Sequence, residues 1–285
     1  MNNFVTDAIN LKSYNLSESD KIIVMYSKDK GLIKGVAKGV KKPKSKLGAR
    51  MDLLVANKLM LFKGKNLDRI CQAEAINTFN KTRQNMDKIF YSMYISEVVN
   101  NFGVEEDPCS NEVYDILYKA LDKISNAQNN VEMLIAIIKF QLKMMQISGF
   151  GIELDTCLCC GEHIEDTNMY FSSKMGGIIC SDCNETFGIK TVLHHKLRDF
   201  LTACLQYDFD YVSEYDLKAN EKVCRVCFEL LKEYINMHCA KKFNSQIIFT
   251  AHNKNDNAET LIYRIAHGTG IKGLQGISPN RDIYY

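Results

Sequence analysis

The sequence predicts an α+β protein of several domains, with a small N-terminal β barrel or sandwich and a C-terminal α-helical domain into which a four-cysteine module is inserted. Three observations predict this fold class. Short β-type runs fill the first 80 residues, apolar residues then recur at helical spacing, and closely spaced cysteines interrupt that spacing. The length of 285 residues suits two or three domains. With 46% hydrophobic residues and only 3 prolines, the composition excludes collagen-like and broadly disordered classes.

The first predicted domain spans residues 1–80. Its β-type runs are residues 22–26, 31–40 and 53–62. Turn or loop signals separate them, namely the Lys/Asp/Gly segment at residues 28–31 and the Lys/Pro/Gly segment at residues 41–48. Short strands separated by such turns favour a small, strongly curved sheet.

Helical spacing begins at Met86 and continues to Phe102, where Asp107 and Pro108 follow and break the pattern. A second helix is expected over residues 113–124, with Ser110 placed to cap its N-terminus. A third, over residues 131–147, is apolar on almost all sides and is therefore expected at the centre of its domain, with Gly149 ending it. These helices make residues 81–153 the first part of the helical domain.

Helical patterning returns after the cysteine block, over residues 196–205 and 223–235. Residues 188–249 are therefore the predicted second part of the helical domain. Residues 250–285 differ in character, because they are first Asn-rich and then Gly-rich, and we treat them as a separate tail.

Two Cys-x2-Cys pairs are the most specific motif. Cys157 and Cys160 form one pair, Cys180 and Cys183 the other, and nineteen residues separate them. Each pair fits a tight turn that aims both sulfurs at one point, so the four thiolates predict a structural Zn²⁺ with no open coordination position. The inserted zinc module is expected over residues 154–187, which hold too few large apolar residues to be stable by burial alone.

Other cysteines and histidines have simpler interpretations. Cys159 and His163 are alternative ligands, but Cys159 lies outside the x2 spacing and His163 is expected to be an exposed neighbour. Cys224 and Cys227 also form a Cys-x2-Cys pair, although their helical pattern favours core packing. The alternative for the four paired cysteines themselves is that they are reduced structural thiols without metal.

No catalytic site is predicted. His194 and His195 lack a nearby carboxylate pair or nucleophile signature, and Gly176 and Gly177 lack the context of a phosphate-binding loop. We therefore expect a protein that is not an enzyme.

The positive charge of the chain is localised. Residues 28–50 hold nine cations against one acid, a charge of +8, whereas the whole chain carries only +2. Closely spaced lysines on a loop between strands can neutralise several phosphates at once, and on a β barrel they would flank a groove suited to single-stranded nucleic acid. The alternative is a solvated loop without function. The candidate nucleic-acid contacts are Lys34, Lys38, Lys41, Lys42, Lys44, Lys46 and Arg50.

Membrane association is not expected. No secretory signal precedes the β-type runs, and the longest aliphatic stretch, residues 134–138, is far shorter than the roughly 20 apolar residues that cross a bilayer. A cytoplasmic location follows, in which thiols stay reduced or bind metal.

Taken in order, these features resemble the RecO family of bacterial recombination mediators. The resemblance covers about residues 1–249 and is carried by Gly31, by the segment from Lys38 to Ser45, by Leu67, Ile70, Ala73 and Glu74, and by the cysteine block that begins at Asp155. It implies an oligonucleotide-binding (OB) barrel at the N-terminus and an α-helical domain interrupted by a zinc module.

The resemblance also implies a function. Proteins of this family bind single- and double-stranded DNA, anneal complementary strands, and work with RecR and single-stranded DNA-binding protein to load recombinase. A nucleoid-associated location in the cytoplasm is the corresponding expectation. Carried over residue by residue, Cys157, Cys160, Cys180 and Cys183 match the zinc ligands, and the lysines from Lys38 to Lys46 with Arg50 match the basic DNA-facing region.

The tail departs from this family. The run from Ala251 to Thr260, followed by Arg264 and the glycines near Gly270, looks like an internal fragment of tRNA(Ile)-lysidine synthetase, an ATP pyrophosphatase. The adenylating loop of that family is missing from this sequence. An RNA-modifying enzyme is therefore the alternative function, and a zinc-stabilised scaffold that binds only proteins is a third.

Overall fold

The computed structural model describes the chain except for residues 1–2, 66, 166–167, 212–214, 216–217 and 243–285. The tail at residues 250–285 therefore lies outside the described residues. Contacts divide the chain into two units, residues 1–239 and residues 240–285. The barrel and the cysteine-rich module both belong to the first of these.

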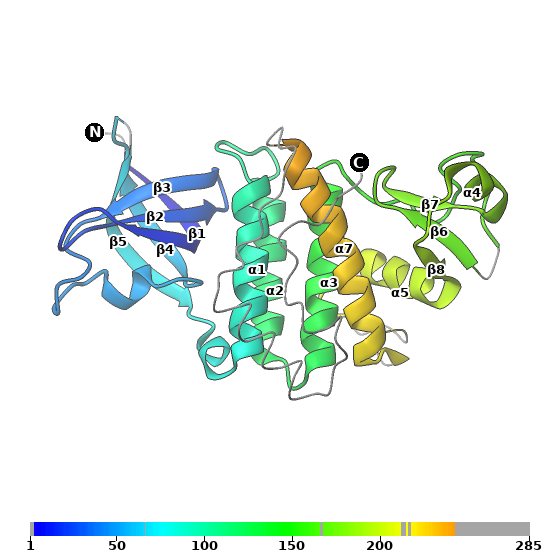
Figure 1. The fold of residues 1–285 in the computed structure, drawn as a ribbon. Coiled ribbons are helices and arrows are strands. Elements are labelled where there is room, and N and C mark those ends of the chain that lie inside the picture. The colour runs from blue at the N-terminus through cyan, green and yellow to red at the C-terminus, as the bar shows by residue number, and fades with distance from the viewer. Residues whose placement is uncertain (1–2, 66, 166–167, 212–214, 216–217, 243–285) are drawn as a thin grey trace, which may run out of the picture. The chain divides into compact units, whose positions relative to one another are not determined.

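Five strands close into the N-terminal barrel: β1 (Asn3–Asn15), β2 (Lys21–Ser27), β3 (Gly31–Ala37), β4 (Ala56–Phe62) and β5 (Asp68–Asn77). Their order is β1-β2-β3-β5-β4, and β4 returns to pair with β1 (Figure 1). All pairings are antiparallel except the short parallel contact of β3 with β5. Apolar side chains, among them Ile23, Met25, Leu59 and Leu61, fill the interior. The prediction of a small β barrel is confirmed.

The strands β1 and β5 were not among the predicted runs, and each contains an irregularity. In β1 the register with β2 shifts between Asn10 and Lys12, and in β5 the register with β4 shifts beside Cys71 and again beside Ile76. An extra residue at such a bulge interrupts the alternation of buried and exposed side chains by which a strand is recognised. Buried Asn10 adds a polar residue to β1 where an apolar one is expected.

Two predicted strand ends were wrong, and backbone conformation explains both. The strand predicted over residues 31–40 ends at Ala37, because Gly39 turns the chain with a φ of 64°. The strand predicted from residue 53 begins at Ala56, because Leu54 adopts a φ of 67° that no strand continues.

Three helices follow the barrel: α1 (Met86–Phe102), α2 (Ser110–Asn126) and α3 (Asn130–Ile147). The predicted helices are confirmed, but Ser110 does not cap α2. Ser110 is the first helical residue, and Cys109 before it is the N-cap and makes no side-chain capping bond. The side chain of Asp107 instead accepts a hydrogen bond from the backbone N–H of Cys109 at 2.9 Å, which stabilises the entry to the helix.

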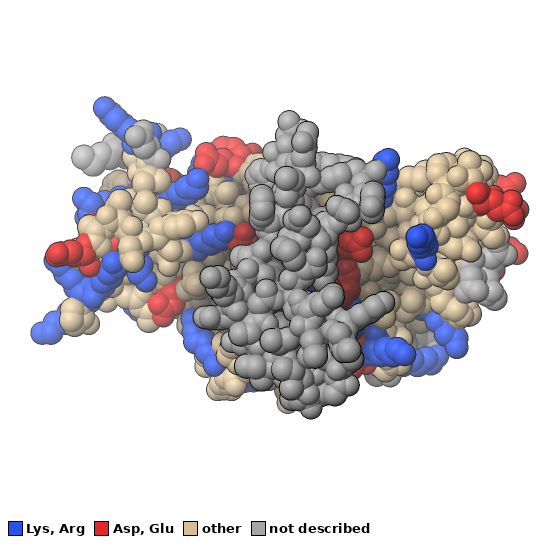
Figure 2. Space-filling view, in the orientation of Figure 1, with Lys and Arg blue, Asp and Glu red and all other residues tan. Residues whose placement is uncertain are grey.

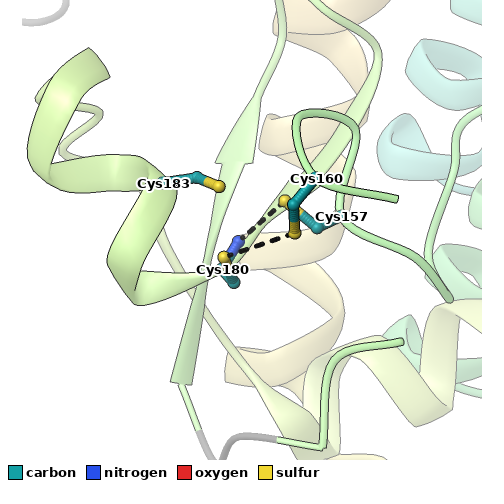
Figure 3. Close-up of side chains that lie close together, drawn as sticks. All are labelled: Cys157, Cys160, Cys180 and Cys183. Carbon is teal, nitrogen blue, oxygen red and sulfur yellow. Dashed lines mark hydrogen bonds between the residues drawn. The ribbon is translucent and has the colours of Figure 1, made fainter. Parts of the chain in front are cut away.

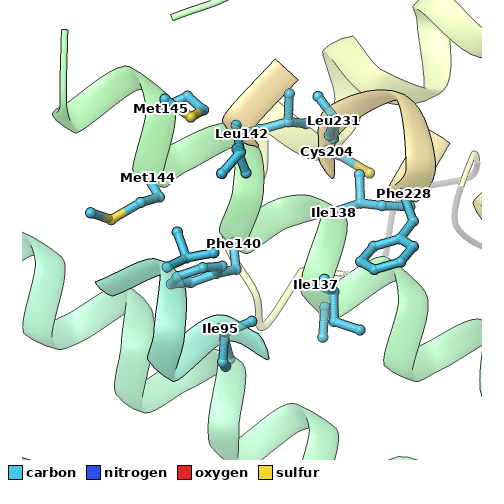
Figure 4. Packing of buried hydrophobic residues seen from close by; sticks show 14 of the residues in the cluster. Ile95, Ile137, Ile138, Phe140, Leu142, Met144, Met145, Cys204, Phe228 and Leu231 are labelled. Carbon is cyan, nitrogen blue, oxygen red and sulfur yellow. The ribbon is translucent and has the colours of Figure 1, made fainter. Parts of the chain in front are cut away.

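Helix α3 is the most buried of the three, as its apolar circumference predicts. Its side chains from Met133 to Met145 contribute to a large cluster shared with α1 and α2 (Figure 4). The helix ends where expected. Gly149, with a φ of 80°, lets the N–H groups of Gly149 and Phe150 reach back to the carbonyls of Gln146 and Met145, which is a Schellman motif.

The cysteine-rich module contains a three-stranded sheet of order β7-β6-β8 and one short helix. Its elements are β6 (Asn168–Ser172), β7 (Gly177–Ile179), α4 (Ser181–Phe187) and β8 (Val192–His194). The sheet therefore continues past residue 187, where the sequence placed the end of the module. Helices α5 (His195–Gln206) and α7 (Glu221–Lys242) follow. Among the described helices, none is long and apolar enough to cross a membrane.

The barrel and the helices are joined by specific bonds. The backbone N–H of Leu32 donates to the carbonyl of Val104 at 2.9 Å, and the hydroxyl of buried Tyr26 donates to the carboxylate of Asp107 at 2.8 Å. Gly31 allows this close approach, because a Cβ there would lie 2.4 Å from the Val104 carbonyl oxygen. Burial and the bond to Asp107 both raise the pKa of Tyr26, so its hydroxyl remains a donor.

Replacing Tyr26 with Phe tests this joint. We expect the free energy of unfolding to fall by about 1.5 kcal/mol, because a buried bond to a charged group is lost while the ring still fills its site. Thermal and denaturant unfolding measure the change. Tyr14→Phe, at a side chain that is 54% exposed, is the control and should cost almost nothing. Equal stability of the two variants would contradict the role of the bond.

Candidate nucleic-acid interface and metal centre

The four paired cysteines lie together in space (Figure 3). The sulfurs of Cys157, Cys160, Cys180 and Cys183 all lie within 4.8 Å of one another, and those of Cys160 and Cys180 are 4.0 Å apart. Tetrahedral coordination at a Zn–S distance near 2.3 Å requires sulfurs about 3.8 Å apart. The cluster is thus slightly wider than a bound zinc ion requires, and a small inward movement of the thiols would complete the geometry.

Two different local structures place these thiols. Cys157 and Cys160 lie on a turn whose ends meet in a bridge between Thr156 and His163, and the N–H of Gly161 donates to the carbonyl of Cys157. Cys180 is the N-cap of α4, which puts Cys183 in the first turn of that helix. The turn and the helix start therefore face each other across the cluster.

Backbone N–H groups surround the sulfur of Cys157. Cys159 and Cys180 each donate to it at 3.4 Å. Burial alone raises the pKa of Cys157, but the backbone donors outweigh it and lower the pKa to about 6. The neighbouring thiols raise the pKa of Cys183, because several adjacent thiolates repel one another. Four such thiols are held together as thiolates only by a cation, and the cluster could hold a metal ion.

The alternative ligands do not belong to this cluster. Cys159 is exposed and is not part of the four-thiol group, and His163 is exposed with its Nδ1 3.0 Å from the carboxylate of Asp155. Cys224 and Cys227 are fully buried on α7, where burial raises the pKa of Cys227 to about 12. The core-packing interpretation of that pair is confirmed.

Gly176 and Gly177 have a structural role, and so does His194. A Cβ on Gly176 would lie 2.8 Å from the Tyr234 hydroxyl, and one on Gly177 would lie 2.6 Å from the Glu153 carbonyl oxygen. These glycines permit close packing at a hairpin. His194 caps α5 by accepting a hydrogen bond from the N–H of Lys196.

Every candidate basic residue is exposed on the barrel. Lys34 lies on β3, and the others lie between β3 and β4, on a segment that we call the basic loop (residues 38–51). Figure 2 shows Lys and Arg side chains over much of the barrel, at the left of the view. Three apolar residues of the same loop, Val40, Leu47 and Met51, are buried in the barrel interior. The loop is therefore anchored, with its cations directed to solvent.

Polar contacts also hold the basic loop. At its start the N–H of Gly39 donates to the carboxylate of Asp20 at 2.7 Å, which lowers the pKa of that carboxyl. At its end the buried amides of Asn10 and Asn57 both donate to the carbonyl of Arg50 at 2.8 Å. These two hydrogen bonds explain why asparagines are buried here. Without them the backbone carbonyl of Arg50 would lack these hydrogen-bond donors.

The structure does not bring all seven cations to one place. Lys41 donates to the carbonyl of Ser17, beside the turn between β1 and β2. Lys46 and Arg50 instead line a groove against β4 and β5, together with Lys58.

The sequence analysis missed Lys58, and with it the exposed cations Lys63, Lys65 and Arg69 of the β4–β5 hairpin. Lys58 is the lone charge within an apolar run, and strand alternation would have directed it outward.

Comparisons with known proteins agree with this architecture. The family model "Recombination protein O N terminal" matches residues 1–79, and "Recombination protein O C terminal" matches residues 83–247. A third family model, "PP-loop domain", matches residues 215–284. That match begins well before residue 250, overlaps the second match, and lies largely outside the described residues.

Curated relatives match about 85% of the chain. The protein named DNA repair protein RecO of Desulforamulus reducens is 31% identical over 239 residues, which is 84% of this chain and 91% of the relative. The protein of the same name from Caldanaerobacter subterraneus subsp. tengcongensis is 31% identical over 242 residues, or 85% and 95% of the two chains. That of Clostridium novyi is 27% identical over 247 residues, or 86% and 93%.

Proposed function

This chain belongs to the RecO family of DNA repair proteins, and from that premise we propose that it is a non-enzymatic recombination mediator that binds single- and double-stranded DNA and anneals complementary strands. The observation that carries the proposal is the basic loop, whose lysines are exposed while its apolar residues anchor it in a closed five-stranded barrel. Cations held in this way can neutralise phosphates without first ordering the loop.

The strand order supports an OB fold for this barrel. A five-stranded barrel in which β1 pairs with both β2 and β4 is the architecture that many single-strand-binding proteins use. We assign DNA contacts to Lys34, Lys38, Lys41, Lys42, Lys44, Lys46 and Arg50.

Zinc is the metal we propose for the four-cysteine cluster. Four sulfur donors in a roughly tetrahedral group suit Zn²⁺ far better than Mg²⁺ or Ca²⁺, which prefer oxygen. With all four positions supplied by protein, the ion would cross-link the turn at Cys157 to the start of α4 and would take no part in chemistry.

Partners and location follow from the family. We propose RecR and single-stranded DNA-binding protein as partners in loading recombinase, and the nucleoid in the cytoplasm as the place of action.

An annealing assay tests the main proposal. Two complementary oligonucleotides should form a duplex faster with the protein than without it, and no ATP should be consumed. The rival function is ATP-dependent RNA modification, which the PP-loop match at residues 215–284 favours. If the protein modifies tRNA with consumption of ATP and does not accelerate annealing, RNA modification becomes the better-supported function. Binding to proteins but not to DNA at low salt would favour the scaffold.

Salt dependence gives a quantitative prediction. If about five side chains meet the phosphates of a single strand, log K should fall with log salt at a slope near −3.5, which is roughly 100-fold between 50 and 200 mM. Changing Lys41, Lys42, Lys44 and Lys46 to Ala should flatten the slope to about −0.7. Fluorescence anisotropy with a labelled oligonucleotide measures both values.

A control variant distinguishes the effect of where the four lysines lie from the effect of losing four positive charges. It replaces four exposed lysines outside the barrel, Lys174, Lys190, Lys196 and Lys222, with Ala. This control loses the same charge and should keep most of the slope. If the two quadruple variants bind equally, the DNA surface lies away from the basic loop.

A further inference from the structure

A groove of about 580 Å³ runs along the barrel beside the basic loop. Lys46, Leu47 and Arg50 of the loop form one wall. The strands β1, β4 and β5 form the remainder, with Val5, Lys58, Leu59, Met60, Cys71, Gln72, Ala73 and Glu74. No described residue of the barrel occupies this space, and its volume lies within the range of about 300–1,000 Å³ typical of ligand sites.

The strand pairing explains the composition of the groove. Val5, Met60 and Gln72 are register partners across β1, β4 and β5, so they form one row on the outer face of the barrel. Val5 is 56% exposed, which is unusual for a branched apolar residue on a strand. Because the bulge leaves Cys71 unpaired, Gln72 pairs with Met60 and joins the outward row. An apolar surface with one amide at its end results.

The lining of the groove carries more positive than negative charge. Three cations, Lys46, Arg50 and Lys58, line it against one acid, Glu74. The guanidinium of Arg50 donates to the carbonyl of Lys46 at 2.9 Å, which holds both residues at the same wall. A ligand with an anionic backbone and flat apolar parts matches this arrangement.

We propose that this groove receives unpaired bases of a single strand whose phosphates lie on the basic loop. The inference rests on the proposed function, since it specifies which part of DNA the barrel contacts. Bases in a duplex are covered by pairing and stacking, whereas those of a single strand can leave the stack and bury a face on Met60 and Val5. The groove thus supplies base contacts that the lysines cannot, and it favours single strands over duplexes.

A pair of oligonucleotides isolates this contribution. One is a thymidine strand, and the other has the same number of phosphates with abasic residues in place of nucleosides. The protein should bind the abasic strand about tenfold more weakly, with an unchanged salt slope. In the variant Val5→Ser, which removes exposed apolar surface from the groove without altering charge, the difference between the two strands should fall below about threefold. The control Val192→Ser, at a similarly exposed valine on a strand outside the groove, should retain the tenfold difference.

A thiol inside the groove provides a measurement on the unaltered protein. Cys71 is partly accessible and lines the groove, whereas Cys109 is also partly accessible and lies outside it. Saturating thymidine strand should slow alkylation of Cys71 at least fivefold and leave Cys109 unchanged, as read by peptide mass spectrometry. The saturating abasic strand should protect neither thiol.

Failure of the inference differs from failure of the proposed function. If thymidine and abasic strands bind equally and Cys71 is not protected, while the four-lysine variant still loses its salt slope, the bases bind elsewhere and only the inference is wrong. If neither strand binds with a salt dependence that requires the basic loop, the proposed function is wrong as well.

Discussion

Replacing Cys160 with Ser is expected to abolish zinc binding and to lower the free energy of unfolding of residues 1–239 by several kcal/mol. Structural zinc contributes apparent binding energies of about 10–16 kcal/mol, because the site exists only in the folded chain. The variant without zinc keeps the stabilisation that comes from packing of the module on the helices. Phe171 and Ile178 of the module belong to the same buried cluster as α3, and Tyr234 of α7 packs on Phe171 with ring centroids 6.2 Å apart.

Elemental analysis and thermal unfolding measure the two effects. We expect one zinc ion per chain in the wild type and none in Cys160→Ser, with the oligonucleotide affinity at low salt largely retained, because the basic loop is anchored in the separate interior of the barrel. Cys159→Ser is the matched control, since Cys159 is an adjacent exposed thiol outside the cluster. Equal zinc content in both variants, or no zinc in the wild type, would contradict the metal assignment.

The second large effect is expected for Phe140→Ala on α3. Phe140 is completely buried in the cluster drawn in Figure 4, where α1, α3 and α7 contribute Ile95, Ile137 and Phe228. Truncating a buried Phe removes its transfer free energy and leaves a cavity, which together cost about 3–5 kcal/mol. Urea unfolding should show a lower midpoint with an unchanged slope.

Phe90→Ala is the comparison for this variant. Phe90 lies on α1 but is 58% exposed, so the same truncation there should cost less than about 0.5 kcal/mol. Similar losses for the two variants would mean that α3 is not the centre of the helical core.

The helices and the four cysteines were predictable because their signals are local. Helical spacing requires only an uninterrupted run, as in α3, and a Cys-x2-Cys pair spans only four residues. The end of β3 and the start of β4 were less predictable. The positive φ angles at Gly39 and Leu54, which set these two strand ends, depend on packing and on bonds to residues distant in the sequence. Strand β1 was not predicted because it also depends on residues distant in the sequence. The side-chain amide of its buried Asn10 is satisfied by the backbone carbonyls of Arg50 and Asp52.

The candidate site was predictable in part. The basic loop is visible as a local excess of charge, but its division into Lys41 on one side and Lys46 with Arg50 on the other depends on how the loop is anchored. The groove required the pairing of β1, β4 and β5, which joins Val5, Met60 and Gln72 from distant parts of the sequence. No pattern within a single strand contains that information.

The bulge at Cys71 also determines how β5 would respond to a change in chain length. Ile70 is buried, yet Gln72 is exposed and Ala73 faces inward, so the two halves of the strand are out of phase by one residue. Deleting Cys71 would place Gln72 directly after Ile70, keep their pairing with Met60 and Leu61, and restore regular alternation of the side chains around the deletion. Loss of one residue here should therefore be tolerated better than loss of a paired residue elsewhere in β5, and a homologous strand of regular alternation would differ here by one residue in length.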